Sequence, residues 1–293
     1  MNLFDKVPSP KAPKILQLLQ DFSNDPRQGK IDLGIGVYKD ETGITPVLET
    51  VKAAEKILVS EQKTKAYIGL AGDPIFCDLA ANLVLGNKLD LKRVNVIQTP
   101  GGSSALRVLY DLVFDVSPHS KIWLPAPTWD NHPPTIKAAG LEFSYYRYFD
   151  LNTQAINFDQ TMEDFKNVRP GDVVLLHGCC HNPTGVNFSK SQWDMVAQVA
   201  LEVGFLPLVD IAYQGFGDGL DEDAYGVRKL IDHLPELLIA SSSSKNFAIY
   251  RDRAGVAITL SKNEKVSKAL GGRLRNLAGT NYSMPPDHGA AVV

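Results

Sequence analysis

Short apolar runs alternate with helical segments along most of this chain of 293 residues, and that alternation limits the folds open to it. Seven runs have the length of buried strands: 94–97, 122–124, 143–146, 173–176, 206–209, 237–240 and 256–260. Between them, 105–114 and 191–203 space their apolar residues as helices do. This pattern predicts an α/β protein with a mainly parallel sheet covered by helices on both faces.

Composition excludes several functional classes. A formal net charge of -3, without a basic stripe, argues against a nucleic-acid partner. No apolar run reaches membrane-spanning length, and 1–6 lacks the apolar stretch of a secretory signal. Cys77, Cys179 and Cys180 are too few for a disulfide framework. We therefore expect a cytoplasmic protein that binds neither membranes nor nucleic acid.

Histidines and cysteines crowd the segment 177–181, as they do in some metal sites. If the segment is extended, neighbouring side chains point to opposite faces and cannot easily meet at one ion. The paired C-x-x-C spacing of structural zinc sites is also missing. We therefore expect packing and site-lining roles here, and no metal site.

Lys245 follows the predicted strand 237–240 directly after a run of serines. A lysine amine forms a Schiff base with an aldehyde, and its pKa falls readily on burial. Ser242 and Arg253 are suited to hold a phosphate, the arginine by a bidentate fork. An aldehyde-binding lysine beside a phosphate clamp suggests pyridoxal 5'-phosphate (PLP), although a serine-lysine motif alone is more often solvated surface.

Chemically useful groups follow five of the predicted strands. In parallel sheets, ligands collect beyond the carboxyl ends of the strands, so these groups are expected to share one rim. In chain order they are Gly101, Gly102 and Ser103, then Trp129, then Asn182, then Asp210 and Tyr213, then Lys245. Their convergence predicts a single site and counts for more than any one motif.

The glycines and Asp210 suit a phosphate and a protonated ring. Gly102 and Ser103 open a helix, where backbone N–H groups and the helix dipole favour an anion. Asp210 could pair with a protonated ring nitrogen, and His132 could support it from behind. The alternatives are an ordinary strand-to-helix turn, a capping aspartate and a loop histidine.

Three further side chains suit the remaining parts of the same ring. Tyr213 and Asn182 could donate hydrogen bonds to a phenolic oxygen, and Trp129 could stack on the ring face. Taken singly, each is more often a structural polar contact or a core aromatic. Tyr67 on its own reads only as a half-exposed aromatic.

Six stretches carry a resemblance to a known family. They are 32–38, 99–103, 127–132, 177–185, 210–216 and 244–247. In this order they resemble the motifs of class I aminotransferases, in the aspartate and aromatic amino-acid group of fold-type I PLP enzymes. The resemblance implies a three-layer large domain like that of aspartate aminotransferase, with a partial small domain.

The resemblance implies transamination between an L-amino acid and a 2-oxo acid through a Schiff base on Lys245. The residues implied to bind the cofactor are Lys245, Gly102, Ser103, Trp129, His132, Asn182, Asp210, Tyr213, Ser242 and Arg253. Lys245, Asp210, Tyr213 and Trp129 would be catalytic, and Gly36, Trp129 and Asn182 would contact substrate. Tyr67 would reach the phosphate across the interface of a homodimer with shared active sites.

The resemblance also implies a division of the chain and one departure at its end. The divisions are an N-terminal arm at 1–13, part of a small domain at 14–44 and the PLP-binding large domain at 45–293. Family members continue further, into the segment that holds the arginine for the substrate α-carboxylate. The chain is then either a fragment or a natural truncation with impaired catalysis, and we expect a fragment.

A second departure concerns substrate choice. Aligned on the family, Gly279 stands where this group has an arginine for the distal carboxylate of acidic substrates. Arg273 and Arg275 lie nearby and are expected to be solvated helix residues, and Met284 makes the entrance more apolar. We expect a bias towards aromatic or other non-acidic amino acids, because a buried carboxylate would go unpaired.

Two other functions stay open on these residues. A PLP-dependent lyase or decarboxylase uses the same lysine and aspartate chemistry, and would release ammonia or carbon dioxide without a 2-oxo acid acceptor. A PLP-binding but inactive interaction protein would keep the cofactor and show no half-reaction.

Overall fold

The computed structural model describes residues 2–7, 14–32, 34, 36–86 and 91–293. It contains two compact units, Met1–Pro46 and Val47–Val293. The first holds the 3₁₀ helix η1 (Leu3–Lys6) and helix α1 (Lys14–Asn24). Of the predicted arm 1–13, residues 1 and 8–13 lie outside the described residues.

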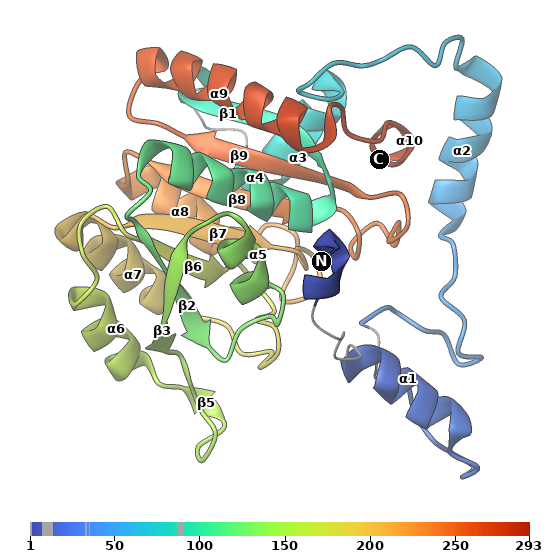
Figure 1. Cartoon of the computed structure of the whole chain (residues 1–293), viewed down its shortest axis with the longest axis horizontal. Helices are drawn as coiled ribbons and strands as arrows, with labels where there is room; N and C mark the ends of the chain where they lie inside the picture. Colours follow the sequence, from blue (N-terminus) through green and yellow to red (C-terminus); the bar gives the residue numbers. More distant parts are fainter. Residues whose placement is uncertain (1, 8–13, 33, 35, 87–90) are drawn as a thin grey trace. The chain divides into compact units, whose positions relative to one another are not determined.

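A sheet of seven strands forms the centre of the larger unit (Figure 1). The strands are β1 (Val94–Pro100), β2 (Lys121–Ala126), β3 (Glu142–Arg147), β6 (Val173–His177), β7 (Leu206–Ile211), β8 (Leu237–Ser242) and β9 (Ala254–Leu260). Their order is β1-β9-β8-β7-β6-β2-β3, and β9 runs antiparallel to both of its neighbours. All seven predicted strands are present, so the prediction of a mainly parallel α/β sheet is confirmed.

Helices cover both faces of this sheet. The helices of the larger unit are α2 (Glu49–Glu61), α3 (Pro74–Leu85), η2 (Leu91–Arg93), α4 (Gly101–Val116), α5 (His132–Ala138), α6 (Phe158–Lys166), α7 (Lys190–Val203), α8 (Tyr225–His233), α9 (Glu264–Tyr282) and α10 (His288–Val292). Apolar residues of α4, α5 and α9 pack on one face, and those of α3, α6, α7 and α8 on the other (Figure 1). A short antiparallel pair, β4 (Phe149–Asp150) and β5 (Ala155–Ile156), lies outside the main sheet.

The strands alternate between the two cores, which explains why they read as continuous apolar runs. In β6, Val174 and Leu176 face the α6–α8 side, while Val173 and Leu175 face the α4 side. All four side chains are at most 1% exposed. Burial on both faces is typical of a central parallel strand.

Local sequence sets the ends of the helices. Ser189 caps α7 and exchanges hydrogen bonds with Gln192, and Gly204 ends the helix in the left-handed region at φ 81°. Such a cap satisfies N–H groups that the first turn leaves free, and glycine adopts this φ at little cost. The helix predicted over 191–203 is therefore found one residue longer.

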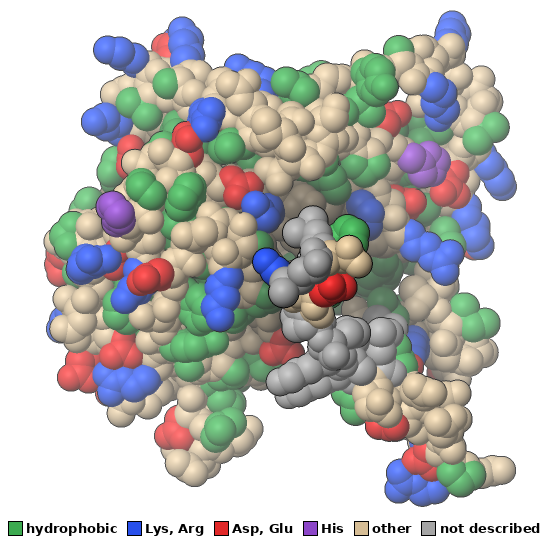
Figure 2. Space-filling model, viewed as in Figure 1, with side chains coloured by type: hydrophobic (Ala, Val, Ile, Leu, Met, Phe, Trp, Pro, Cys, Tyr) green, Lys and Arg blue, Asp and Glu red, His purple; other side chains and the backbone are tan. Residues whose placement is uncertain are grey.

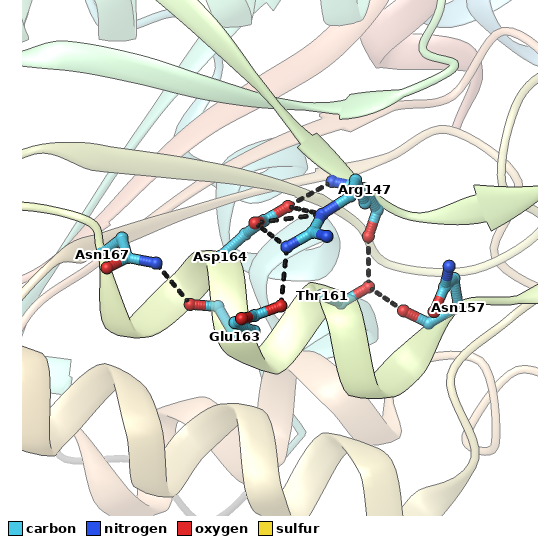
Figure 3. A network of polar contacts seen from close by, with 6 residues as sticks. All are labelled: Arg147, Asn157, Thr161, Glu163, Asp164 and Asn167. Carbon is cyan, nitrogen blue, oxygen red and sulfur yellow. Dashed lines mark hydrogen bonds and ion pairs between the residues drawn. The ribbon is translucent and has the colours of Figure 1, made fainter.

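A polar network ties the end of β3 to α6 (Figure 3). Arg147 donates to Asp164 and Glu163, and its backbone carbonyl accepts from the Thr161 hydroxyl at 2.6 Å. The Arg147 guanidinium holds the pKa of Asp164 below its usual range. Because β3 is the outermost strand of the sheet, these contacts anchor that edge strand to α6.

Two further observations concern the surface charge and the length of the helices. On the face of the molecule shown in Figure 2, basic and acidic side chains are interspersed over the larger unit. Among the described residues, no helix is both long and apolar enough to cross a membrane.

Candidate active site

The predicted strand-end residues of the larger unit lie on one rim of the sheet. β1, β2, β6, β7 and β8 run in the same direction, and each is followed by, or ends in, one of the predicted groups. Asp210 lies in β7 opposite His177 of β6 and Ala240 of β8. The sheet therefore collects groups that are far apart in the sequence.

Lys245 lies just beyond β8, partly buried against an aromatic ring. Its Nζ is 4.7 Å from the centroid of the Tyr213 ring. Burial lowers the pKa of Lys245, and Arg253 lowers it further, while Asp210 acts in the opposite direction. A lowered pKa increases the fraction of neutral amine, which is the form that attacks a carbonyl carbon.

Tyr213 lies beside Lys245 and forms a hydrogen bond with the side chain of Asn182. Burial is the main cause of its raised pKa, and the Asn182 side chain, to which it hydrogen-bonds, acts against the increase. Its phenol is thus protonated at neutral pH and available as a donor. The structure therefore brings together Tyr213 and Asn182, the two residues that the sequence predicted as hydrogen-bond donors to one phenolic oxygen.

Asp210 is held from behind by a buried histidine. His132 is fully buried, and its Nε2 lies 3.0 Å from Oδ2 of Asp210. The other ring nitrogen, Nδ1, lies 2.7 Å from the hydroxyl of Thr128. Trp129 packs edge-on against His132, with ring centroids 5.2 Å apart.

The hydrogen bonds continue to a second histidine, His177. The contacts of His177 determine which atom is the donor in each bond of this series. The backbone N–H of Asn182 donates to Nδ1 of His177 at 3.4 Å, so Nε2 of His177 carries the proton and donates to Thr128. Thr128 in turn donates to Nδ1 of His132, which leaves His132 Nε2–H to donate to Asp210. Burial lowers the pKa of His177 well below its usual value, which keeps this ring neutral.

Thr128 and His177 were missed as site residues by sequence reasoning. Thr128 lies four residues before His132, but threonine at that spacing carries no recognisable signal. His177 belonged to a superficial metal pattern and to the stretch 177–185 that resembles the family, and it was assigned no role of its own. Their role depends on the pairing of β6 with β7 and on the loop after β2, and both are features of the tertiary structure.

Two glycines and two polar side chains form a cradle at the start of α4, made of Gly101, Gly102, Ser242 and Arg253. A Cβ on Gly101 would lie 2.5 Å from Nη2 of Arg253, and one on Gly102 would lie 3.0 Å from Cβ of Ser242. Pro100 provides no side-chain cap for α4, and Ser103 lies in its first turn. Arg253 donates to the hydroxyl of Ser244 at 3.1 Å.

This cradle fits a phosphate group. The first turn of a helix has N–H groups without intrahelical partners, and its dipole favours an anion. Glycines let the backbone approach closely, and the adjacent guanidinium supplies a positive charge. The hydrogen bond of Arg253 to Ser244 was not predicted from the sequence, which assigned Ser242 and Arg253 together to a phosphate.

Two of the predicted site residues, Tyr67 and Gly36, have open surroundings. The Tyr67 side chain is 89% exposed, which leaves its ring free of the packing seen for Trp129. Gly36 belongs to the unit Met1–Pro46, where Asp32 accepts hydrogen bonds from Gly34 and Lys39. A Cβ on Gly36 would meet no atom within 4 Å.

The sequence argument against a meeting of Cys179 and Cys180 assumed an extended backbone, and that assumption is wrong. The backbone bends at 178–180 instead of staying extended, and Cys180 has a φ of 46°. The sulfur atoms of Cys179 and Cys180 and a carboxylate oxygen of Asp223 all lie within 4.8 Å of one another. Burial raises the pKa of both thiols, so both are protonated at neutral pH.

Comparison with known proteins shows what this arrangement is similar to. A family model described as aminotransferase class I and II matches residues 28–293. A tyrosine aminotransferase of Rhizobium meliloti is 47% identical over 99% of this chain and 75% of the relative. An aspartate aminotransferase of Salmonella typhi is 42% identical over 99% of this chain and 74% of the relative.

A solved structure adds the cofactor of a relative. The aromatic-amino-acid aminotransferase of Burkholderia pseudomallei, covalently bound to pyridoxal phosphate, superposes with a TM-score of 0.97 at 35% identity. The match covers 100% of this chain and 74% of that one.

Proposed function

Because this chain belongs to the class I and II aminotransferases, in the aspartate and aromatic amino-acid group, we propose that PLP binds at the rim of its larger unit and serves transamination there. The observation that carries this proposal is Lys245 in a half-buried position, on the same rim as the glycine–arginine cradle and Asp210. The relatives do not favour the alternatives of a lyase, a decarboxylase or an inactive binding protein.

The donor set fits PLP part by part. Gly102, Ser103, Ser242 and Arg253 would hold its phosphate, Asp210 its ring nitrogen, Tyr213 and Asn182 its phenolic oxygen, and Trp129 its ring face. Lys245 would bind its aldehyde carbon. When bound, the cofactor supplies an electron-poor ring that accepts the electron pair released as the substrate Cα–H bond breaks.

The residues of the chain would orient and move protons around that group. The Lys245 amine, with its lowered pKa, would carry the proton between the substrate Cα and the former aldehyde carbon of the cofactor, on the other side of the amino nitrogen. Asp210 would be oriented towards the ring nitrogen by the hydrogen bond that it accepts from Nε2 of His132. An ionised Asp210 keeps a ring nitrogen protonated, which strengthens the pull on electrons.

The direct test follows amino-group transfer in two stages. Protein loaded with PLP receives an L-amino acid alone, and the released 2-oxo acid is counted per chain. A different 2-oxo acid is then added, and formation of its amino acid is measured. One equivalent in each stage supports transamination, whereas ammonia or carbon dioxide release without the acceptor would show a lyase or decarboxylase.

Replacement of Gly101 tests the cradle separately from catalysis. We expect Gly101→Ala to lower the free energy of unfolding by about 1–2 kcal/mol, because φ is +74° there. It should also weaken retention of PLP on dialysis, because the methyl group would displace the Arg253 guanidinium.

Gly171→Ala is the matched control, since φ is +84° there and a Cβ would meet nothing within 4 Å. This variant should lose similar stability while keeping PLP. Equal retention of PLP in the two variants would contradict the phosphate cradle.

The surroundings of Gly279 support a preference for non-acidic amino acids. A Cβ on Gly279 would lie 3.3 Å from a methyl carbon of Leu70, and the sulfur of Met284 accepts from the Ile68 backbone at 3.2 Å. Arg273 instead pairs with Asp115 in the last turn of α4, at the end remote from the cradle. These neighbours offer apolar contact and no fork for a second carboxylate.

We expect the wild-type protein to use phenylalanine more efficiently than aspartate. Gly279→Arg should raise kcat/KM for aspartate by about 10- to 100-fold, since one hydrogen bond to a charged group contributes about 1.5–3 kcal/mol. Gly272→Arg, on the same helix with open space around it, is the control and should leave aspartate use unchanged. Equal efficiency with both substrates in the wild-type protein would refute the preference.

We also propose a cytoplasmic homodimer with shared sites and a division at 1–13, 14–44 and 45–293. The exposure of Tyr67, Ile75 and Leu79 supports a second copy over this surface. Cys77, Cys179 and Cys180 are all free, in keeping with a reducing compartment. Sedimentation of the purified protein measures the oligomeric state.

A further inference from the structure

The thiols of Cys179 and Cys180 and the carboxylate of Asp223 lie close together in the larger unit. They belong to the loops after β6 and β7, near α7 and α8. Cys179 and Asp223 are 4% and 5% exposed, and Cys180 is partly buried. The bend at Cys180 turns both sulfur atoms towards the carboxylate, and all three ligand atoms lie within 4.8 Å of one another. The third cysteine, Cys77, belongs to α3 and is not part of this group.

The loop after β7 holds the carboxylate of Asp223 in place. Its Oδ2 accepts from the backbone N–H groups of Gly215 at 2.8 Å and Gly217 at 2.9 Å. Its Oδ1 accepts from the N–H of Asp218 at 2.9 Å. A carboxylate has about four acceptor positions, so three such bonds orient the group and leave one position free.

A cavity of about 180 Å³ reaches this group, and its lining is acidic. Cys179 and Asp223 line it together with Asp218 and Glu222. Lys190 is the basic residue among the lining side chains, and its Nζ lies 5.4 Å from the ring centroid of Tyr225. Three carboxylates against one ammonium favour entry of a cation, and the space admits a water as a further ligand.

We propose that Cys179, Cys180 and Asp223 form a binding site for a thiophilic divalent cation of the Zn²⁺ and Cd²⁺ class. Two thiolates, one carboxylate and a water make a tetrahedral set of the kind that zinc prefers. With Zn–S bonds of about 2.3 Å, the sulfur atoms would be about 3.8 Å apart, so the ligands must approach by about 1 Å or less. Each thiol passes its proton to solvent as its bond to the metal forms.

Metal at this site would act on catalysis through the loop that carries Asn182. Cys180 lies two residues before Asn182, whose backbone N–H donates to His177 in the hydrogen-bond chain behind Asp210. Contraction of the cysteine pair would displace this part of the loop. We therefore expect Zn²⁺ to inhibit reversibly, a consequence that rests on the proposed function.

The test measures binding of the metal itself. The PLP-loaded protein is dialysed against Zn²⁺ and bound metal is counted per chain, and Cd²⁺ is followed by its thiolate charge-transfer absorption in the ultraviolet. We expect one ion per chain in the wild-type protein and in the Cys77→Ser control, with no comparable binding of Mg²⁺. Cys180→Ser and Asp223→Asn should weaken binding by more than about tenfold, because loss of even an orienting partner costs about 10- to 100-fold.

Two results would overturn the site: no stoichiometric Zn²⁺ binding to the wild-type protein, or unchanged affinity in Cys180→Ser. Thermal unfolding checks that each variant is folded, and Cys180, being partly exposed, is the substitution that disturbs packing least. Because binding is measured without turnover, its failure is separate from failure of transamination, which the metal-free protein tests.

Discussion

Replacement of Lys245 with alanine is expected to lower the rate of amino-group transfer by at least about 10⁴-fold, because one side chain provides both the nucleophile and the proton carrier. Its half-buried amine, with a pKa lowered by burial, is suited to both roles. Alanine keeps the backbone after β8 and removes only the amine and its stem. The visible absorption of the cofactor bound to that amine should disappear as well.

Single-turnover release of 2-oxo acid from PLP-loaded protein measures this effect. Lys268→Ala is the matched control, since Lys268 lies on α9 with its side chain 76% exposed and forms an ion pair with Glu264 on the same helix. The control should keep the rate and the absorption. If Lys245→Ala retained more than about one-tenth of the wild-type rate, Lys245 would not be the reacting amine.

The second large effect is expected at Asp210. We expect Asp210→Asn to lower kcat by on the order of 10²–10³-fold, the cost of removing one preorganised electrostatic group from an active site. An asparagine side chain has a similar shape but no charge to keep a ring nitrogen protonated. It would also leave His132 Nε2–H, fully buried in the structure, with a weaker acceptor.

Steady-state rates at saturating amino acid measure this loss, and the wavelength of the cofactor absorption reports on its ring nitrogen. Asp221→Asn serves as the control, because Asp221 is 81% exposed and pairs with Arg228 on the surface. Thr128→Val should produce a smaller decrease than Asp210→Asn, since it breaks the hydrogen-bond chain one step further back. A rate for Asp210→Asn within twofold of the wild type would rule out a charge-based role.

Much of the fold could be predicted from the sequence because buried parallel strands leave a simple pattern. Runs such as 173–176 are apolar at every position, since Val173 and Val174 face opposite cores and both are buried. The predicted boundaries differ from the observed ones by a few residues, as for β1, which continues to Pro100. Strand ends are polar or glycine-rich, and apolar periodicity does not reach them.

The rim position of Asp210, Tyr213 and Lys245 was also predictable, because parallel strands deliver their carboxyl ends to one edge. The partners of these residues were not. Thr128 and His177 are linked to Asp210 by hydrogen bonds that join the segment after β2 to strands β6 and β7. A meeting of Cys179 and Cys180 was judged unfavourable on the condition of an extended backbone, and the φ of 46° at Cys180 shows that this condition does not hold.

By itself, the sequence determined the strands and the lysine and aspartate at the ends of two of them, because each depends on residues close together in the chain. Only the tertiary structure decided how Arg253 reaches the cradle. β9 runs antiparallel between β1 and β8, so its first residue, Ala254, pairs with Pro100 at the end of β1. The beginning of β9 therefore lies at the same edge as the ends of its neighbours, and Arg253 lies beside Gly101. Strand direction depends on long-range pairing, which a local pattern does not contain.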